Sequence, residues 1–285
     1  MNDSSHPRSF ARQDLRNYSF KRQHLNDADF TGADLRGCHF NGAQLMNANF
    51  QQAKMGQSLR QQMVWVGAAI ATFLIVGHTI STLVASSLGQ TPTDKAWNYV
   101  ITLVISLGIA GAGQGLRSLL PVLFKRVAEL LSSVAAGAVV GFYYAGVATD
   151  KDPRWAIVGA GVAGVVTGLG CLLWRRRTIL VVSLRLAGAL TAYGFSFLLG
   201  ATGLACLNVG MLLPGGGLMG LSLLYLWFTL TGLVEAVQVI RQAPGTSFRR
   251  ANLTHAQFSA PMSHTDFTEA VGWIFEEKTN FQDGG

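Results

Sequence analysis

The chain has 285 residues, of which 49% are hydrophobic and only 13% are charged. An average soluble domain carries roughly 25% charged residues, so this composition argues against an ordinary soluble protein and indicates a membrane protein. The formal net charge is +7, but the lysines and arginines lie beside apolar segments and not within one basic domain. We therefore expect a lipid bilayer, and no nucleic acid, as a partner.

The N-terminal part of the chain repeats with a period of five residues. Residues 1–9 are polar and lack an apolar stretch, which predicts a disordered N-terminus and no signal peptide. Over residues 10–60 a large apolar residue occupies every fifth position: Phe10, Leu15, Phe20, Leu25, Phe30, Leu35, Phe40, Leu45, Phe50 and Met55. A helix returns side chains to one face after 3.6 residues and a strand after two, so neither element fits this period.

A second position recurs with the same period. In "ADFTGADLRGCHFNGAQLMNANF" the residue two places before each large apolar centre is Ala or Cys, and Asp, Asn, His or Gln precedes the centre. This pattern resembles the pentapeptide repeat, commonly written A-(D/N)-L-x-x. The resemblance implies a right-handed quadrilateral β-helix in which four units form one coil. The centre and the small residue would point inward, and the other three would face water.

The resemblance also bears on location and partners. Membrane-attached pentapeptide-repeat proteins are especially familiar from cyanobacteria, so a cyanobacterial plasma or thylakoid membrane is implied by the resemblance alone. Several soluble members are acidic mimics of DNA that bind topoisomerase. The first 60 residues here carry eight Lys and Arg against five Asp and Glu. Their net charge is therefore positive, which argues against mimicry of DNA.

The middle of the chain, residues 63–241, is apolar, and about 20 consecutive apolar residues suffice for one membrane-spanning helix. Six such segments are predicted: Val64–Ala85, Trp97–Leu116, Val127–Val147, Trp155–Trp174, Leu186–Leu207 and Leu218–Ile240. The stretch around Pro121, after the second segment, is interpreted either as part of a span or as a broken interfacial segment. The sequence thus predicts an α-helical transmembrane bundle of about six spans.

The basic residues predict the orientation of these spans, since short cytoplasmic loops carry an excess of lysine and arginine. The following basic residues fall on one side: Lys54, Arg60, Arg117, Lys125, Arg126, Arg175, Arg176, Arg177 and Arg241. The loops on the other side are short and close to neutral. We therefore expect both termini in the cytoplasm.

The five-residue pattern returns over residues 246–268, with centres at Phe248, Leu253, Phe258 and Phe267. The unit that contains Pro261 is one residue short, and the sequence leaves open whether the coil bends or ends there. Each block of repeats alone is a small stack, and repeat architectures need at least three stacked units with capped ends.

We expect the two blocks to join into one β-helix of roughly four coils, with the helical bundle inserted between them, because an even number of spans places both blocks on one side. The alternative is two independent stubs. Residues 269–285 are predicted to cap the stack with Trp273, Ile274 and Phe281.

Polar side chains within the apolar segments are functional candidates, because burying them in a membrane is costly. The candidates are His78, Gln114, Arg185 and Glu235. Arg185 is expected to extend toward the lipid headgroups, and Glu235 to pair with Arg185 or Arg241. Gln114 is expected to form a hydrogen bond between helices, and His78 to be hydrogen-bonded or interfacial. The spans show no pair of acids at mid-depth, which argues against an ion-coupled transporter.

Other motifs give no catalytic site. The segment "GAGVAG" fits G-x-G-x-x-G but lies within a predicted span, so we expect no dinucleotide there. The cysteines, Cys38, Cys171 and Cys206, lack metal-ligand spacing and are expected to be reduced and structural. No nucleophile with a nearby base and no phosphate loop is recognised.

The sequence therefore predicts a non-enzymatic multi-pass membrane protein with no catalytic, metal or cofactor site. Its cytoplasmic β-helix would serve as a protein-docking scaffold or as an assembly or organising factor. The alternative hypothesis is a transporter or exporter of a small or lipidic substrate, regulated by the β-helix. The expected partner is a protein or a larger membrane complex, and a homo-oligomer is left open.

Overall fold

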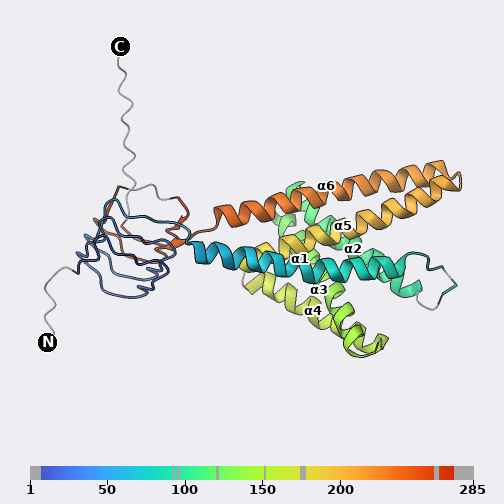
Figure 1. Cartoon of the computed structure of the whole chain (residues 1–285), viewed down its shortest axis with the longest axis horizontal. Coiled ribbons are helices and arrows are strands. Elements are labelled where there is room, and N and C mark those ends of the chain that lie inside the picture. The colour runs from blue at the N-terminus through green and yellow to red at the C-terminus, as the bar shows by residue number, and fades with distance from the viewer. Residues whose placement is uncertain are drawn as a thin grey trace, which may run out of the picture. The chain divides into compact units, whose positions relative to one another are not determined.

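The computed structural model describes residues 8–91, 93–94, 97–119, 122–150, 152–173, 178–259 and 263–272. The chain divides into two compact units (Figure 1). One is built from residues 1–63 together with 242–285, and the other from Val64–Arg241. We call the first the repeat unit and the second the helical unit.

Successive coils of the repeat unit are joined by parallel β-bridges between residues twenty positions apart. Asp14 pairs with Asp34, and Asp34 pairs in turn with Lys54. Each coil turns a corner once in every repeat, where the second residue after the centre takes a left-handed backbone conformation, as at Gly37 with φ of 78° and Asn47 with φ of 58°. Glycine and asparagine tolerate this conformation best. The five-residue period therefore encodes one corner per repeat.

The interior of the repeat unit is filled by the repeat centres. The following centres are at most 1% exposed: Phe20, Leu25, Phe30, Leu35, Phe40, Leu45, Phe50, Phe248 and Leu253. The remaining centres are partly buried against them: Phe10, Leu15, Met55, Phe258 and Phe267. Two columns of stacked rings run through the interior, with centroids 4.8–5.3 Å apart: Phe10–Phe30–Phe50–Phe258 and Phe20–Phe40–Phe248–Phe267. The predicted inward orientation of the centres is confirmed.

The two blocks of repeats pair directly with each other. Strand β1 (Asn49–Phe50) lies parallel to β3 (Gln257–Phe258), and β2 (Thr246–Ser247) lies parallel to β4 (Thr265–Asp266). A bridge also joins Gln44 to Asn252. One coil is therefore composite, because it begins in the N-terminal block and is completed by the C-terminal block. The prediction that the blocks join is confirmed, and the alternative of two independent stubs is wrong.

The short repeat unit near Pro261 does not end the winding. Beyond it, the ring of Phe267 stacks on that of Phe248 at 5.3 Å, and Asn252 pairs with Val271. The two residues of each pair are nineteen positions apart instead of twenty, so this coil contains one residue fewer than the others. Pro261 itself lies outside the described residues, as do residues 1–7 and the three side chains of the predicted cap: Trp273, Ile274 and Phe281.

The chain leaves and re-enters the repeat unit where Gly56 meets Gly245, a contact that we call the junction. A Cβ placed on Gly245 would lie 2.0 Å from the carbonyl oxygen of Gly56. The buried hydroxyl of Thr246 accepts a hydrogen bond from the Gly56 amide at 2.9 Å and donates one to the Leu35 carbonyl at 2.9 Å. The junction is therefore a backbone-to-backbone contact that admits no side chain at position 245.

A disulfide should form between the two blocks in the double variant Q44C/N252C. Gln44 and Asn252 are bridge partners, and their side-chain amides lie 3.4 Å apart. Neighbouring strands run about 4.8 Å apart, within the Cα separation of about 4.4–6.8 Å that a disulfide needs. After mild oxidation and proteolytic cleavage within the helical unit, the two fragments should migrate together on a non-reducing gel.

The control for this disulfide is Q44C/Q257C, because Gln257 pairs with Asn49 on another side of the coil. Both variants are made with the native cysteines replaced: Cys38, Cys171 and Cys206. Equal cross-linking of the two pairs would contradict the observed register.

The helical unit contains six helices within the described residues that are long and apolar enough to cross a membrane. They are α1 (Leu59–Ser87), α2 (Trp97–Leu119), α3 (Val122–Ala148), α4 (Pro153–Leu173), α5 (Thr178–Asn208) and α6 (Leu212–Gln242). The prediction of six such segments is confirmed. Pro121, between α2 and α3, lies outside the described residues.

Small residues let helices of this unit approach closely. Between α3 and α4, a Cβ placed on Gly141 would lie 2.5 Å from the Cβ of Ala163 and 2.3 Å from the Gly159 carbonyl oxygen. On α2, a Cβ on Gly115 would overlap the ring of Phe228. Such close packing stabilises the association of helices in a bilayer, where the hydrophobic effect does not drive helices together because lipid tails are apolar too.

Candidate functional site

One outward side of the repeat unit carries charges that neutralise each other. Arg16 and Arg36 bind the carboxylates of Asp14 and Asp34, respectively, with nitrogen–oxygen distances of 2.6 Å. The side-chain hydrogen bond from Arg16 lowers the pKa of Asp14 to about 2, and the bond from Arg36 lowers the pKa of Asp34. We call this surface the paired side.

Another outward side carries an excess of positive charge. Its coils stack through backbone bonds from the amide of Arg22 to the carbonyl of Asn41 at 3.1 Å, and from the amide of Gly42 to the carbonyl of Arg249 at 2.9 Å. Four basic residues of this surface, which we call the basic side, are Lys21, Arg22, Arg249 and Arg250. Glu269, on the last coil, forms ion pairs with the two later arginines. The coil between the two pairs of basic residues carries Asn41 and Gly42, neither of which is charged.

A cluster of three ionisable side chains, which we call the ion cluster, joins α3, α5 and α6 within the helical unit. Arg185 pairs with Glu235, and its second terminal nitrogen lies 3.9 Å from the carboxylate of Glu129. The three side chains are 17–27% exposed. The predicted pairing of Glu235 with Arg185 is confirmed. The guanidinium that we expected to extend toward headgroups has carboxylate partners inside the unit.

Glu129 was missed by the sequence reasoning. It stands near the start of the predicted span Val127–Val147, so an acid within an apolar segment was the available signal. Each member of the ion cluster lies seven positions from one end of its helix: Glu129 from Val122, Arg185 from Thr178 and Glu235 from Gln242. At 1.5 Å per residue this is about 10 Å along each axis, which explains why the three groups meet at one level.

The side chain of Gln114 on α2 is 2% exposed, and neither atom of its amide has a hydrogen-bond partner among the described residues. It lies against Gly188 and Gly232, where an added Cβ would come within 2.8 Å of the amide. Gly188 lies three positions from Arg185, and Gly232 lies three positions from Glu235, which is about one helical turn in each case. The expected hydrogen bond between helices is therefore not found for Gln114 within the described part of the chain.

Removing the arginine of the ion cluster should destabilise the helical unit. In R185L the carboxylates of Glu129 and Glu235 lose the guanidinium that they share, and breaking a buried pair typically costs about 3–5 kcal/mol. We expect a lower midpoint of thermal unfolding in detergent micelles. The double variant R185L/E235L should recover part of the loss, because it also removes one carboxylate.

The control for this prediction is R154L, since Arg154 is an exposed residue in the first turn of α4. Its unfolding midpoint should match that of the unmodified protein. An R185L midpoint equal to that of R154L would mean that the ion cluster contributes nothing to stability.

His78 on α1 reaches α3. Its Nε2 lies 3.1 Å from the hydroxyl of Tyr143, and the two rings meet edge to face with centroids 5.8 Å apart. This observation agrees with the prediction of a hydrogen-bonded histidine.

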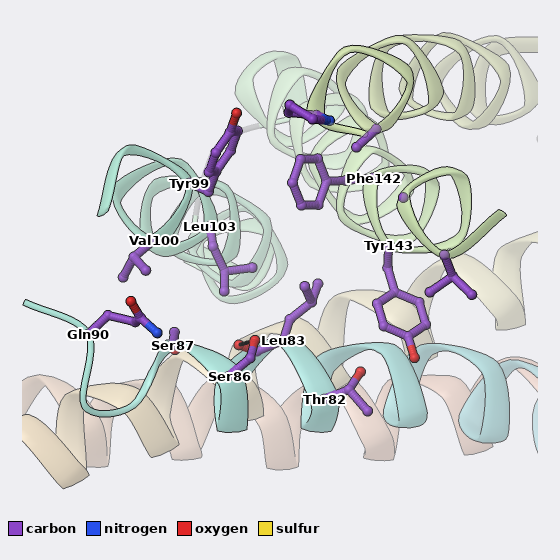
Figure 2. A pocket seen from close by; sticks show the side chains of 14 residues that line it. Thr82, Leu83, Ser86, Ser87, Gln90, Tyr99, Val100, Leu103, Phe142 and Tyr143 are labelled. Carbon is purple, nitrogen blue, oxygen red and sulfur yellow. Dashed lines mark hydrogen bonds between the residues drawn. The ribbon is translucent and has the colours of Figure 1, made fainter. Parts of the chain in front are cut away.

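A pocket of about 550 Å³ opens among α1, α2, α3 and α4 (Figure 2). It is lined by Thr82, Leu83, Ser86, Ser87, Gln90, Tyr99, Val100, Leu103, Phe142, Tyr143, Gly146, Val147, Pro153 and Ala156. Figure 2 shows Tyr99 and Leu103 on one helix and Phe142 on another, on opposite sides of the space above α1. Nothing in the sequence pattern predicted this pocket, because its lining comes from four separate helices and from Gln90, which follows α1.

The described residues contain no group of three or more His, Cys, Asp or Glu that could hold a metal ion. The "GAGVAG" segment lies within α4, as its position in a predicted span required. Cys38 and Cys171 are buried free thiols, and Cys206 is partly buried. The three cysteines therefore belong to the packing of the two units, as expected.

Comparison with known proteins identifies the repeats. Residues 14–58 match the family model for pentapeptide repeats, in eight copies. No curated protein and no solved structure matches the chain. The matched residues include the buried centres from Leu15 to Met55, so the pattern that the family shares is the one that builds the core here. The N-terminal block of this chain therefore consists of pentapeptide repeats, and the described residues after it include six helices of membrane-spanning length.

Proposed function

We propose that this protein is a non-enzymatic membrane scaffold that docks a protein partner on its repeat unit. On this proposal the coils close as the right-handed quadrilateral β-helix of the family. The observation that carries this proposal is the filled interior, which contains two columns of stacked rings. Because side chains fill the interior, the outward sides are the surface on which a partner can be recognised. Long rigid coils present side chains at fixed spacing, which suits protein docking.

The basic side is the surface that we assign to docking. Arg16 and Arg36 on the paired side already have carboxylate partners at 2.6 Å, whereas the next coil beside Lys21 and Arg22 carries the uncharged residues Asn41 and Gly42. Complementary charge steers association and fixes register. We therefore propose an acidic segment of a protein as the docked partner.

Purification in mild detergent, followed by identification of co-eluting proteins, tests this proposal. A stoichiometric partner should be retained by the unmodified protein and released by the variant K21E/R22E. The control is R36Q on the paired side, which should retain the partner. Elution without any partner, or equal retention by both variants, would contradict docking on the basic side.

We further propose that both termini lie in the cytoplasm and that the membrane is a cyanobacterial plasma or thylakoid membrane. The support for the orientation is the excess of lysine and arginine on one side of the spans. Protease added to right-side-out vesicles should spare tags at positions 2 and 285 and should remove a tag inserted beside Thr93, which follows α1. Opposite fates for the two terminal tags would contradict an even number of crossings.

A transporter or exporter is the second candidate, and the ion cluster favours it. Ionisable groups placed about 10 Å from helix ends are of the kind that line solute pathways. They lie one turn from the amide of Gln114, which has no hydrogen-bond partner within the described part of the chain. Purified protein in liposomes distinguishes the two functions. If the monomer moves solute across the vesicle membrane and R185L does not, transport is favoured. If no solute crosses the membrane, the scaffold is favoured.

A further inference from the structure

The pocket among α1, α2, α3 and α4 belongs to the helical unit, whereas the basic side belongs to the repeat unit. We propose that the pocket binds one uncharged, hydroxyl-bearing lipid from the bilayer. Four observations carry this inference: the position of the pocket along the helices, its apolar wall, the state of its hydroxyl groups, and the chemistry of its described lining.

The pocket lies at helix ends. Thr82 and Ser87 stand in the last two turns of α1, Tyr99 in the first turn of α2, Val147 in the last turn of α3 and Ala156 in the first turn of α4. In a spanning helix these turns lie where the acyl chains meet the headgroups, and tyrosine is enriched at that depth. A lipid of the surrounding leaflet can therefore reach the pocket without leaving the bilayer.

The wall of the pocket suits an acyl chain. Its apolar side chains are Leu83, Val100, Leu103, Phe142, Val147 and Ala156. The ring of Phe142 lies 6.1 Å from that of Tyr99, centroid to centroid, so residues of α3 and α2 face each other there. A volume of about 550 Å³ falls within the roughly 300–1,000 Å³ of small-molecule sites.

Three hydroxyl groups of the pocket already donate their protons to carbonyl groups of their own helix. Thr82 donates to the carbonyl of His78 at 2.9 Å, Ser86 to that of Leu83 at 2.9 Å, and Ser87 to that of Val84 at 2.8 Å. Each hydroxyl oxygen keeps lone pairs that can accept a hydrogen bond. The three therefore act as acceptors, and they match a headgroup that brings O–H donors.

The same lining is poorly suited to a phosphate headgroup. A phosphate offers acceptors and negative charge, and it is best bound by arginine or lysine. None of the described lining residues is a basic residue. A glycerol or sugar headgroup, which is neutral and rich in hydroxyls, fits both the acceptors and the lack of charge.

Photo-crosslinking of the full-length protein in phosphatidylcholine vesicles tests the proposal. The probes are a diacylglycerol, which has one free hydroxyl group, and a phosphatidylcholine, which has a phosphate and no hydroxyl group; both carry the same diazirine-bearing acyl chain. The diacylglycerol should label peptides that contain the lining residues about fivefold more than the phosphatidylcholine probe does, which corresponds to roughly one net hydrogen bond. Equal labelling by the two probes, or labelling spread over all six helices, would overturn the proposal.

Two variants and a control sharpen this test. L103W should fill the pocket and abolish the label, whereas I105W should keep it, because Ile105 is 55% exposed on the same helix and does not line the pocket. T82V removes one acceptor at nearly constant shape, and it should keep the label but lose the preference for diacylglycerol. If L103W does not fold, V147W blocks the pocket from a 59% exposed position. Unchanged labelling in the blocked variant would show that the lipid binds elsewhere.

Discussion

Replacing Phe50 with aspartate should unfold the repeat unit. Its ring is fully buried and lies 5.0 Å from that of Phe30 and 4.9 Å from that of Phe258, so it holds both blocks together. Loss of a buried phenylalanine costs about 3–5 kcal/mol, and an uncompensated buried charge costs about as much again. The sum approaches or exceeds the roughly 5–15 kcal/mol that a domain has in total.

Cys38 provides the measurement for this variant. Burial raises the pKa of its thiol to about 12, so a maleimide at pH 8 should leave it unmodified in the folded protein, since the thiolate is the reactive form. In F50D the thiol should return to a pKa of about 8.5 and react readily. The other two cysteines are replaced beforehand: Cys171 and Cys206.

The matched control is Q51D, which introduces the same charge one residue later. Gln51 is exposed, and its side-chain amide donates a hydrogen bond at the surface to the side chain of Gln257 at 3.1 Å. Its variant should protect Cys38 as well as the unmodified protein does. Equal reactivity of Cys38 in F50D and Q51D would contradict the assignment of position 50 to the interior of the repeat unit and of position 51 to its surface.

The single methyl group of G245A should separate the two blocks at the junction. The added Cβ would lie 2.0 Å from the Gly56 carbonyl oxygen and 2.2 Å from the Gln57 amide nitrogen, and neither is a side chain that can turn away. We therefore expect the backbone to shift and the Q44C/N252C disulfide to form in much lower yield. In a second protein, which keeps Cys38 as its only cysteine, we expect Cys38 to become reactive.

The control for the junction is G161A, because a Cβ on Gly161 meets nothing within 4 Å. It should leave both the disulfide yield and the protection of Cys38 unchanged. A disulfide yield in G245A equal to that in G161A would mean that the contact at Gly56 can open without disturbing the coils.

The core of the repeat unit could be predicted because it follows from a local rule. A corner every five residues fixes which side chains point inward, so Leu35 and Phe40 were assigned without knowledge of any distant contact. The existence of six helices was equally local, since it depends on the length of apolar segments alone.

Features that depend on contacts between distant residues could not be predicted to the same extent. The sequence indicated that the blocks join, but the register in which Gln44 meets Asn252 depends on how two residues 208 positions apart are brought together. The need for a glycine at position 245 appears only when its neighbour Gly56 is known. The ion partner Glu129 and the lipid pocket likewise require the arrangement of several helices.

The composite coil also sets an order of events during synthesis. The N-terminal coils emerge first, but their next coil cannot close until Thr246 and the residues after it are made, 190 positions after Gly56. At about 5–20 residues per second this is a wait of roughly 10–40 seconds, during which the edge that ends at Phe50 is unpaired. The composite coil can therefore close only after the ribosome has synthesised all six helices. A chain that stops early keeps an open edge, of the kind that aggregates or is recognised by quality control.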